Sequence, residues 1–254
     1  MSRPVAILDA GGQYVDLVRK AVERQGVPAK VLALNTELSE LKDNYQAVII
    51  SGSPASSHAE SAPKTDPKLW QSDLPILGIC YGMQSMVVSC GGEVAKNAIR
   101  EDGRITTQIN STHPIFKGLK DQITALFTHG DFVKKLPDGF KVIGSHKMSD
   151  GQTAYSAVVF GNKYGVQFHP EVFDDSPDGY QIFKNFLELA DVKTDSEFSS
   201  KQLDNIVNSK QKQIIEQVNG RDVIAFVSGG VDSSVAALLA SKVIPKEKFH
   251  AFYI

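Results

Sequence analysis

The chain has 254 residues and a formal net charge of −2, and 42% of its residues are hydrophobic and 22% are charged. This length allows one domain of about 150–200 residues and part of another. The nearly neutral charge gives no broad electrostatic reason to bind nucleic acid or an anionic membrane, so we expect neither as a partner. We find neither a run approaching the roughly 20 apolar residues that span a bilayer nor a cleavable signal pattern, and we expect a cytosolic protein that acts on small molecules.

Neither the two cysteines nor four of the histidines are expected to bind a metal, and among these residues only Cys80 is expected to be catalytic. The two cysteines, Cys80 and Cys90, lack metal-ligand spacing, which argues against a zinc site and against a disulfide framework. A reducing compartment would keep Cys80 available as a thiol, and Cys90 is expected to pack in a core. Four histidines show no recurring ligand spacing and are expected to be structural or solvated, namely His58, His113, His146 and His250.

Short apolar runs alternate with helical patterns in the first 90 residues. The runs predict strands at 5–8, 30–34, 47–52 and 75–79. Helices are expected at 15–22 and from Tyr81 onward. This alternation predicts a largely parallel sheet with helices on both faces.

From residue 105 the pattern changes to closely spaced extended segments, which indicate an antiparallel extension of the sheet. The segments are 105–109, 125–128, 141–145, 154–160 and 165–168. Apolar residues at helical intervals, from Tyr180 to Leu187, then predict a helix that closes the domain near residue 190. The expected fold class is α/β, a largely parallel mixed sheet flanked by helices over residues 1–190.

A second, incomplete α/β unit is expected at 203–254, after a polar linker at 191–202. It contains a lead-in helix over 203–218, a strand at 223–227, a glycine-rich loop, a helix at 236–243 and a strand at 249–254. A nucleotide crevice requires further strand and helix units. We therefore expect the remainder of this unit, and any domains beyond it, to be missing from the chain.

The segment Gly78-Ile79-Cys80-Tyr81-Gly82 lies between an apolar strand and a helix, as in a nucleophile elbow. The small flanking residues permit a sharp turn, and the helix N-terminus favours the thiolate. By itself the pattern fits an ordinary strand-to-helix turn equally well.

His169 and Glu171 are two residues apart in an extended segment, so their side chains leave the same face. One could contact Cys80 while the other orients the ring, and such a set can attack an amide carbon and protonate the departing amine. Alone, His-Pro-Glu is more often a surface turn. Gly52, in the segment Ser51–Pro54, could offer a backbone amide to an anionic intermediate, although the segment also suits a plain β-turn.

The segments DAGGQY, IISGSP, LGICYGMQ, EDG, THGD and QFHPEV, in this order, resemble the glutamine amidotransferase domain of the class I, triad family over residues 5–190. The resemblance implies that Cys80, His169 and Glu171 hydrolyse the glutamine side-chain amide through a thioester, without a cofactor. It also implies an oxyanion hole at Gly52 and Tyr81. The other residues that it places around the glutamine are Ser53, Gln84, His129, Gly130 and Asp131.

One position departs from this family, which usually reads Gly-Gly-Pro where the chain has Gly52-Ser53-Pro54. A positive φ at Ser53 would strain the loop by about 1–2 kcal/mol and could slow glutamine hydrolysis. If only the amide of Ser53 is used, nothing follows. We favour the second interpretation because serine is small.

The string SGGVDSS, between the apolar run VIAFV and a helix, presents backbone amides and a helix N-terminus, which suit a phosphate. It resembles the PP-loop of ATP pyrophosphatases, although a serine-glycine turn alone is common. The resemblance implies ATP contacts from Ser228, Gly229, Gly230, Val231, Asp232, Ser233 and Ser234. Asp232 is better suited to capping the helix or contacting magnesium than to binding phosphate.

An amidotransferase domain followed by a PP-loop is similar to the order found in the GMP synthetase family. This similarity implies that the intact enzyme uses ATP and Mg²⁺ to activate XMP, and that ammonia from glutamine then yields GMP, AMP and pyrophosphate. Such a domain would waste glutamine without an acceptor, so the chain alone is expected to be a slow glutaminase.

Two alternatives remain open: an inactive or interaction fragment, and a cysteine peptidase or γ-glutamyl hydrolase on a related fold. Gln84, the THGD segment and the PP-loop disfavour the hydrolases.

Overall fold

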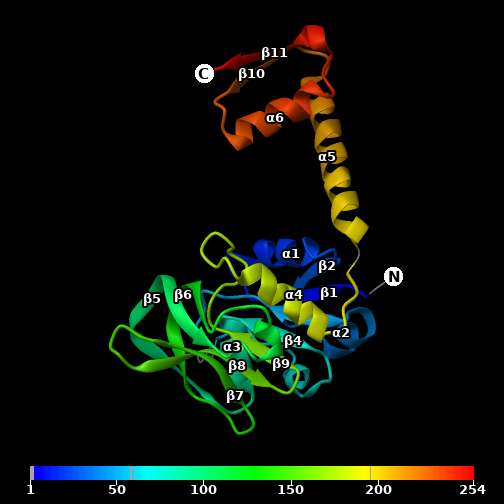
Figure 1. The fold of residues 1–254 in the computed structure, drawn as a ribbon. Helices are drawn as coiled ribbons and strands as arrows, with labels where there is room; N and C mark the ends of the chain where they lie inside the picture. Colours follow the sequence, from blue (N-terminus) through cyan, green and yellow to red (C-terminus); the bar gives the residue numbers. More distant parts are fainter. Residues whose placement is uncertain (1–2, 58, 60, 195) are drawn as a thin grey trace. The chain divides into compact units, whose positions relative to one another are not determined.

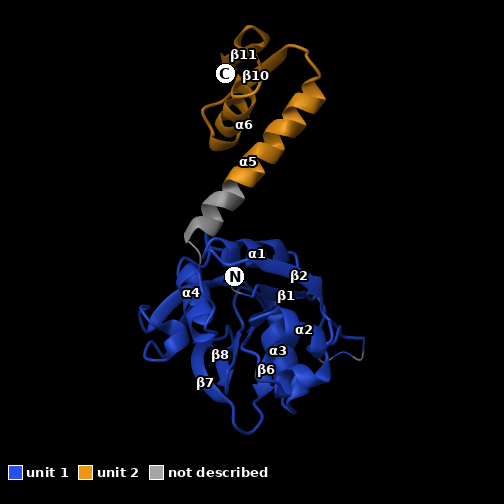
Figure 2. Cartoon of the chain, turned by 90° about the vertical axis from the view of Figure 1, so that its right-hand side faces the viewer, with its two compact units in different colours: residues 1–195 blue, residues 196–254 orange. Residues whose placement is uncertain are grey.

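The computed structural model describes residues 3–57, 59, 61–194 and 196–254, with the backbone alone at 98 and 196–203 (Figure 1). The chain forms two compact units, residues 1–195 and 196–254, which are coloured separately in Figure 2. The division falls between 195 and 196, inside the segment 191–202 that the sequence predicts to be a linker. Among the described helices, none combines the length and apolar character needed to cross a membrane.

The first unit contains a mixed sheet of nine strands in the order β2-β1-β3-β4-β9-β8-β7-β5-β6. The first five of these strands are parallel to one another: β2 (Ala29–Ala33), β1 (Val5–Asp9), β3 (Ala47–Ile50), β4 (Ile76–Ile79) and β9 (Lys163–Val166). The rest continue the sheet in antiparallel pairs: β8 (Thr153–Phe160), β7 (Lys141–Lys147), β5 (Glu93–Ile109) and β6 (Gln122–Lys135). The antiparallel strands agree with the change in sequence pattern near residue 105, with one correction: the segment expected at 165–168 forms β9, which pairs in parallel with β4 and antiparallel only with β8.

Helices cover both faces of the parallel strands. The core on one face includes residues of α1 (Val15–Glu23) and α4 (Gly179–Leu189). The core on the other face includes residues of α2 (Leu38–Asn44) and α3 (Tyr81–Ser89). Because side chains alternate along a strand, Ile7 belongs to the first core and its neighbour Leu8 to the second. This burial on both faces explains why β1, β3 and β4 are apolar without alternation.

The hairpin of β5 and β6 is longer than the sequence predicts. The expected strand at 105–109 is only the end of β5, which begins at Glu93 and has 17 residues. Its first part is polar, and its register with β6 shifts between Lys96 and Glu101, so it shows no regular alternation. This irregular part of β5 contributes to the site described below.

The second unit contains α5 (Ser196–Val218), β10 (Val223–Val227), α6 (Val231–Ser241) and β11 (Phe249–Tyr253). Strands β10 and β11 are parallel, with α6 between them in the chain. Two boundaries correct the sequence predictions. Helix α5 begins at Ser196 instead of 203, and its added first part includes the good helix formers Glu197, Lys201 and Gln202. Helix α6 begins at Val231 instead of 236, directly after the N-cap Gly230.

Candidate active site

Cys80 lies at a sharp turn between β4 and α3. Its φ of 51° and ψ of −101° are unusual for a residue with a side chain. The flanking glycines allow this turn: a Cβ atom on Gly78 would lie 2.5 Å from the carbonyl carbon of Gly82, and one on Gly82 would lie 2.7 Å from the carbonyl oxygen of Ile50. The N–H of Cys80 donates to the carbonyl of Val166 at 2.7 Å, which ties the turn to β9.

His169 reaches Cys80 from the neighbouring strand. Strands β4 and β9 are parallel, so the chain leaves both at the same edge of the sheet. The ring of His169 forms a hydrogen bond with Cys80, and its Nδ1 lies 2.8 Å from Oε1 of Glu171. The three side chains are buried, with 3–5% of each residue exposed. The structure thus brings together the three residues that the sequence predicts to be a triad.

Two opposing effects determine the charge of His169. Burial lowers the pKa of the imidazole, but the hydrogen bonds to Cys80 and Glu171, together with their negative charges, outweigh it and raise the pKa to about 10. The ring therefore carries a proton at neutral pH. Behind it, Ser176 Oγ donates to the carbonyl of His169 at 2.8 Å, and the Tyr14 ring packs edge-on at 5.1 Å between centroids.

The loop after β3 lies against the same imidazole. A Cβ atom on Gly52 would lie 2.8 Å from Cε1 of His169, and one on Gly12 would lie 2.2 Å from the carbonyl oxygen of Gly52. Ser53 does not adopt a positive φ, so the strain considered from the sequence does not arise. Its Oγ accepts a hydrogen bond from the N–H of Ala55 at 3.1 Å. The N–H of Tyr81 is the first of helix α3, where amides lack partners within the helix.

These groups line a cavity of about 650 Å³, a size that suits a small-molecule ligand. Cys80 and His169 line it together with the predicted residues Gly52, Ser53, Gln84, His129, Gly130 and Asp131. Glu171 lies behind His169 and does not line the cavity. Tyr81 does not line it either. Lys96, Asn97 and Arg100 of β5 also line the cavity and were not predicted from the sequence.

Charges of both signs surround the cavity. Arg100 forms an ion pair with Asp102 at 3.0 Å. The hydrogen bond with Asp102 is the main reason that the pKa of Arg100 is raised, and the charges of Cys80 and Asp131 add to it. Ser56 Oγ donates to the Asp131 carboxylate, which joins the loop after β3 to β6.

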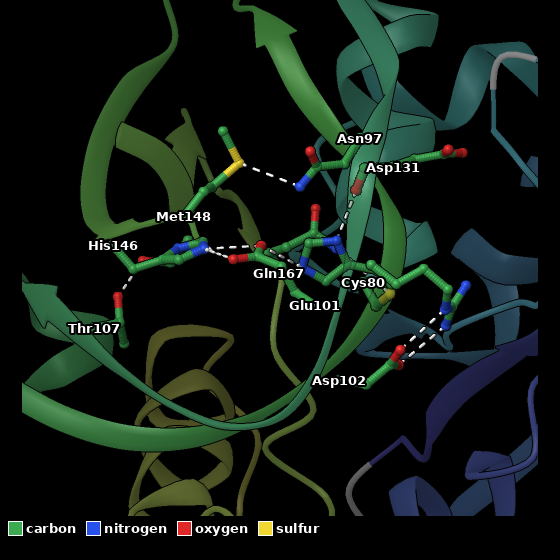
Figure 3. A network of polar contacts seen from close by, with 12 residues as sticks. Cys80, Asn97, Glu101, Asp102, Thr107, Asp131, His146, Met148 and Gln167 are labelled. Carbon is green, nitrogen blue, oxygen red and sulfur yellow. Dashed lines mark hydrogen bonds and ion pairs between the residues drawn. The ribbon is translucent and has the colours of Figure 1, made fainter. Parts of the chain in front are cut away.

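A chain of hydrogen bonds connects the floor of the cavity to the Cys80 sulfur. Nε2 of Gln84 donates to the carbonyl of Asp131 at 3.0 Å and to Oε1 of Gln167 at 3.1 Å. Nε2 of Gln167 in turn donates to Sγ of Cys80 at 3.5 Å (Figure 3). Gln167 was not predicted from the sequence, although it begins the QFHPEV segment.

Beneath this floor, Glu101 lies between two buried histidines. Nε2 of His146 lies 2.9 and 3.0 Å from the two carboxylate oxygens (Figure 3), and Nε2 of His129 lies 3.4 Å from Oε2. Nδ1 of His129 lies 2.8 Å from the carbonyl of Asp131, so this nitrogen carries the proton. Burial lowers the pKa of His129 to about 4. His146, which the sequence predicts to be structural or solvated, is buried here, whereas His58 lies outside the described residues.

The glycine-rich loop of the second unit joins β10 to α6. Gly229 has a φ of 78°, and Ser233 Oγ accepts from the N–H of Ser228 at 3.2 Å while it donates to the carbonyl of Gly230 at 3.1 Å. Asp232 is in the first turn of α6. The loop exposes the N-terminus of a helix, which is the arrangement that binds phosphate groups. Among the described residues, no group of three or more His, Cys, Asp or Glu side chains could hold a metal ion.

Comparison with protein families agrees with this geometry. Residues 6–189 match the family model for glutamine amidotransferase class-I. The chain belongs to this family. Residues 202–254 match the model for NAD synthase, so the class-I amidotransferase domain is followed by part of a second domain.

The curated relatives of this amidotransferase are longer than the chain. It is 38% identical over 245 residues to a glutamine-hydrolyzing GMP synthase from Syntrophomonas wolfei, covering 96% of the chain and 46% of that protein. It is 36% identical over 254 residues to the enzyme of the same name from Caldicellulosiruptor saccharolyticus, covering 98% of the chain and 47% of that protein. The chain therefore spans about half the length of the curated relatives that it matches.

Solved structures support the amidotransferase fold. A Thermoplasma acidophilum protein, which is provisionally assigned as one of the subunits of a GMP synthase, aligns with a TM-score of 0.66 and 27% identity, covering 75% of the chain and 95% of that structure. A glutamine amidotransferase from Thermotoga maritima aligns with a TM-score of 0.57 and 18% identity, covering 86% of the chain and 94% of that structure. At 18% identity, this second comparison shows the fold alone.

Proposed function

We propose that the chain hydrolyses the side-chain amide of glutamine to glutamate and ammonia, with Cys80 as nucleophile. The observation that carries the proposal is the buried set Cys80, His169 and Glu171, in which one ring nitrogen of His169 lies 2.8 Å from Glu171 and the ring also contacts Cys80. Family membership supports the same reaction class.

The geometry suits acyl transfer in two steps. The Cys80 thiolate attacks the amide carbon, and His169 gives its proton to the nitrogen as the carbon–nitrogen bond breaks and ammonia leaves. His169 then takes a proton from water, which attacks the thioester, so that glutamate departs and the Cys80 thiolate is restored. Glu171 keeps the imidazolium oriented and paired during both steps. The N–H groups of Gly52 and Tyr81 would hold the negative oxygen of each intermediate.

The charges around the cavity support a zwitterionic amino acid as substrate. Lys96 and Arg100 would attract its α-carboxylate, and Asp131 its α-ammonium group. Gln84 uses its NH₂ group for two acceptors within the protein, so its carbonyl oxygen is left to accept from the substrate. His129 and Gly130 would complete the floor and wall beside Asp131.

For the longer protein that the relatives represent, we propose ATP-dependent amination of XMP to GMP with the released ammonia. The support is the similarity to glutamine-hydrolyzing GMP synthases and the form of the loop at 228–234. The backbone amides of Gly229 and Gly230 and the hydroxyls of Ser228, Ser233 and Ser234 would hold ATP phosphates, while Asp232 could contact magnesium. A cytosolic location is part of the proposal, since it would keep Cys80 reduced.

The test is glutamine-dependent ammonia release by the chain, by Cys80→Ala and by His169→Ala. Each assay is run with and without the C-terminal half of the Syntrophomonas wolfei relative. We expect slow, Cys80-dependent release that the added half accelerates, because a partner domain that orders the site would couple hydrolysis to use of the ammonia. Equal release by the parent chain and Cys80→Ala would refute the proposal.

A further inference from the structure

Gln167 lies at the end of a hydrogen-bond chain of fixed direction, next to the sulfur of Cys80. The residue is 1% exposed, so it makes its hydrogen bonds inside the protein. Nε2 lies 3.5 Å from Sγ of Cys80, and Oε1 lies 3.1 Å from Nε2 of Gln84. Both polar ends of the amide therefore have partners, as buried polar groups require.

The orientation of the Gln84 and Gln167 side-chain amides follows from the carbonyl of Asp131, which can only accept hydrogen bonds. The carbonyl of Asp131 accepts hydrogen bonds from both Gln84 and His129, so the Gln84 atom that faces it must be the NH₂ group. The second hydrogen of this NH₂ group then goes to Gln167 Oε1. The amide of Gln167 cannot flip without placing two donors against each other, so its NH₂ group stays turned toward Cys80.

We propose that Gln167 is a further catalytic residue, which donates a hydrogen bond to the Cys80 sulfur and thereby favours the thiolate, with Gln84 as the residue that fixes its orientation. The proposal rests on the proposed function for its catalytic consequence, but the effect on the sulfur is independent of glutamine. A hydrogen bond to the charged form of a group favours that form. When the Cys80 proton passes to His169, the negative charge on sulfur gains a neutral donor in addition to the imidazolium.

Several charged groups also lie near this sulfur and affect its ionisation or share its cavity. His169 forms a hydrogen bond with it and is paired with Glu171, Arg100 interacts with it through charge, and Lys96 and Asp131 line the same cavity. None of these groups is changed by a substitution of Gln167. A comparison among Gln167 variants therefore isolates the contribution of its amide.

The experiment measures alkylation of Cys80 by iodoacetamide as a function of pH, in a Cys90→Ala background in which Cys80 is the only thiol. Gln167→Met keeps a long unbranched side chain but removes the donor. We expect its whole alkylation profile to move to higher pH by about one unit, so that on the rising part of the profile its alkylation is about tenfold slower than that of the background protein at the same pH. Gln167→Glu places a carboxylate beside the sulfur and is expected to move the profile further, by about two units.

Controls separate this effect from a general disturbance of the fold. Gln122→Met, on an exposed residue of β6, should leave the profile unchanged. Gln84→Met should give a profile between those of the background protein and Gln167→Met, because the Gln167 amide could then rotate, and it serves as the test if neither Gln167 variant folds. In glutamine hydrolysis, Gln167→Met should lower kcat about tenfold with little change in KM, since its amide touches sulfur and not the substrate.

Two outcomes distinguish this proposal from the proposed function. Alkylation profiles of folded Gln167→Met and Gln167→Glu within about 0.2 pH units of the background protein would overturn the role of Gln167 even if the parent chain hydrolyses glutamine. A shifted profile in a chain that never releases ammonia would support the contact with sulfur and refute the hydrolytic function.

Discussion

Gly52 lies so close to His169 that a Cβ atom on residue 52 would be 2.8 Å from Cε1 of the imidazole. Carbon atoms of real side chains do not approach to this distance, so a larger residue at 52 must displace the ring. The glycine thereby serves the geometry of the site as well as the turn.

Gly52→Ala is expected to lower glutamine hydrolysis by about 10²-fold, because a small displacement of a reacting group has an effect of this size. The effect should be on kcat, with thermal unfolding little changed. Gly151→Ala, in the exposed turn between β7 and β8, is the matched control and should retain activity although its φ of 84° makes alanine unfavourable there. Full activity of Gly52→Ala would contradict the close contact.

Glu171→Gln is expected to lower kcat by about 10²-fold and to move the alkaline limb of the activity profile to lower pH by about 1–2 units. Glu171 is among the groups that raise the pKa of His169 to about 10, so removal of its charge lowers that pKa. The ring must carry a proton to release ammonia, and activity is therefore lost as pH rises through the lower value. Glu188→Gln, on the exposed side of α4, is the control, and a limb that coincides with that of the parent chain would refute the role of Glu171.

The pair Glu101 and His146 should show strong coupling in a double-mutant cycle. His146→Leu leaves the Glu101 carboxylate buried without its main donor and is expected to lower the free energy of unfolding by about 3–5 kcal/mol. The double variant Glu101→Leu/His146→Leu should be less destabilised than the sum of the single variants by more than about 1.5 kcal/mol. Urea unfolding followed by the fluorescence of Trp70, the single tryptophan, measures this in the first unit.

A control cycle uses an exposed ion pair in the same hairpin, Lys134 with Glu93, whose charged atoms are 3.3 Å apart. Its side chains are 62% and 52% exposed, so we expect a coupling below about 0.5 kcal/mol. Equal coupling in the two cycles would mean that burial of Glu101 and His146 adds nothing to their interaction.

The stability of the first unit should depend on the charge of His129. Burial lowers its pKa from 6.5 to about 4, so between these values the unfolded chain binds a proton that the folded chain does not. The free energy of unfolding therefore falls by about 3 kcal/mol in total as the pH is lowered from 6.5 to 4. The free energy of unfolding should fall less steeply across this window in His129→Gln than in the parent chain.

The matched control for His129 is His250→Gln, which removes an exposed histidine from the second unit. Its unfolding curve, followed by Trp70, should keep the slope of the parent chain. Identical slopes for His129→Gln and the parent chain would show that the ring is not buried as neutral imidazole.

Local patterns in the sequence predict the parallel half of the sheet and the turn at Cys80 well, for a physical reason. Apolar runs of β1, β3 and β4 are buried on both faces, and the glycines at 78 and 82 are required where backbones approach. Neither signal depends on a distant residue. The placement of His169 beside Cys80 follows from the parallel pairing of β9 with β4, which brings the ends of both strands to one edge of the sheet.

The contacts of Gln167 and Glu101 could not be predicted in this way. Gln167 meets Cys80 across 87 positions of the chain, and His146 meets Glu101 across 45. Both contacts depend on strand order, and the second also depends on the register shift in β5; no local periodicity encodes either feature. His146 also lacked a motif, so its burial became evident only from the packing of β7 against its neighbours.

All residues that line the cavity at Cys80 lie between Gly11 and His169, within the first unit. A polypeptide that ended at residue 195 would therefore carry every described residue of this pocket. The Thermoplasma acidophilum protein, provisionally assigned as a GMP synthase subunit, likewise aligns with 75% of the chain. The pocket in which we propose that glutamine is hydrolysed is thus contained in one compact unit of the chain.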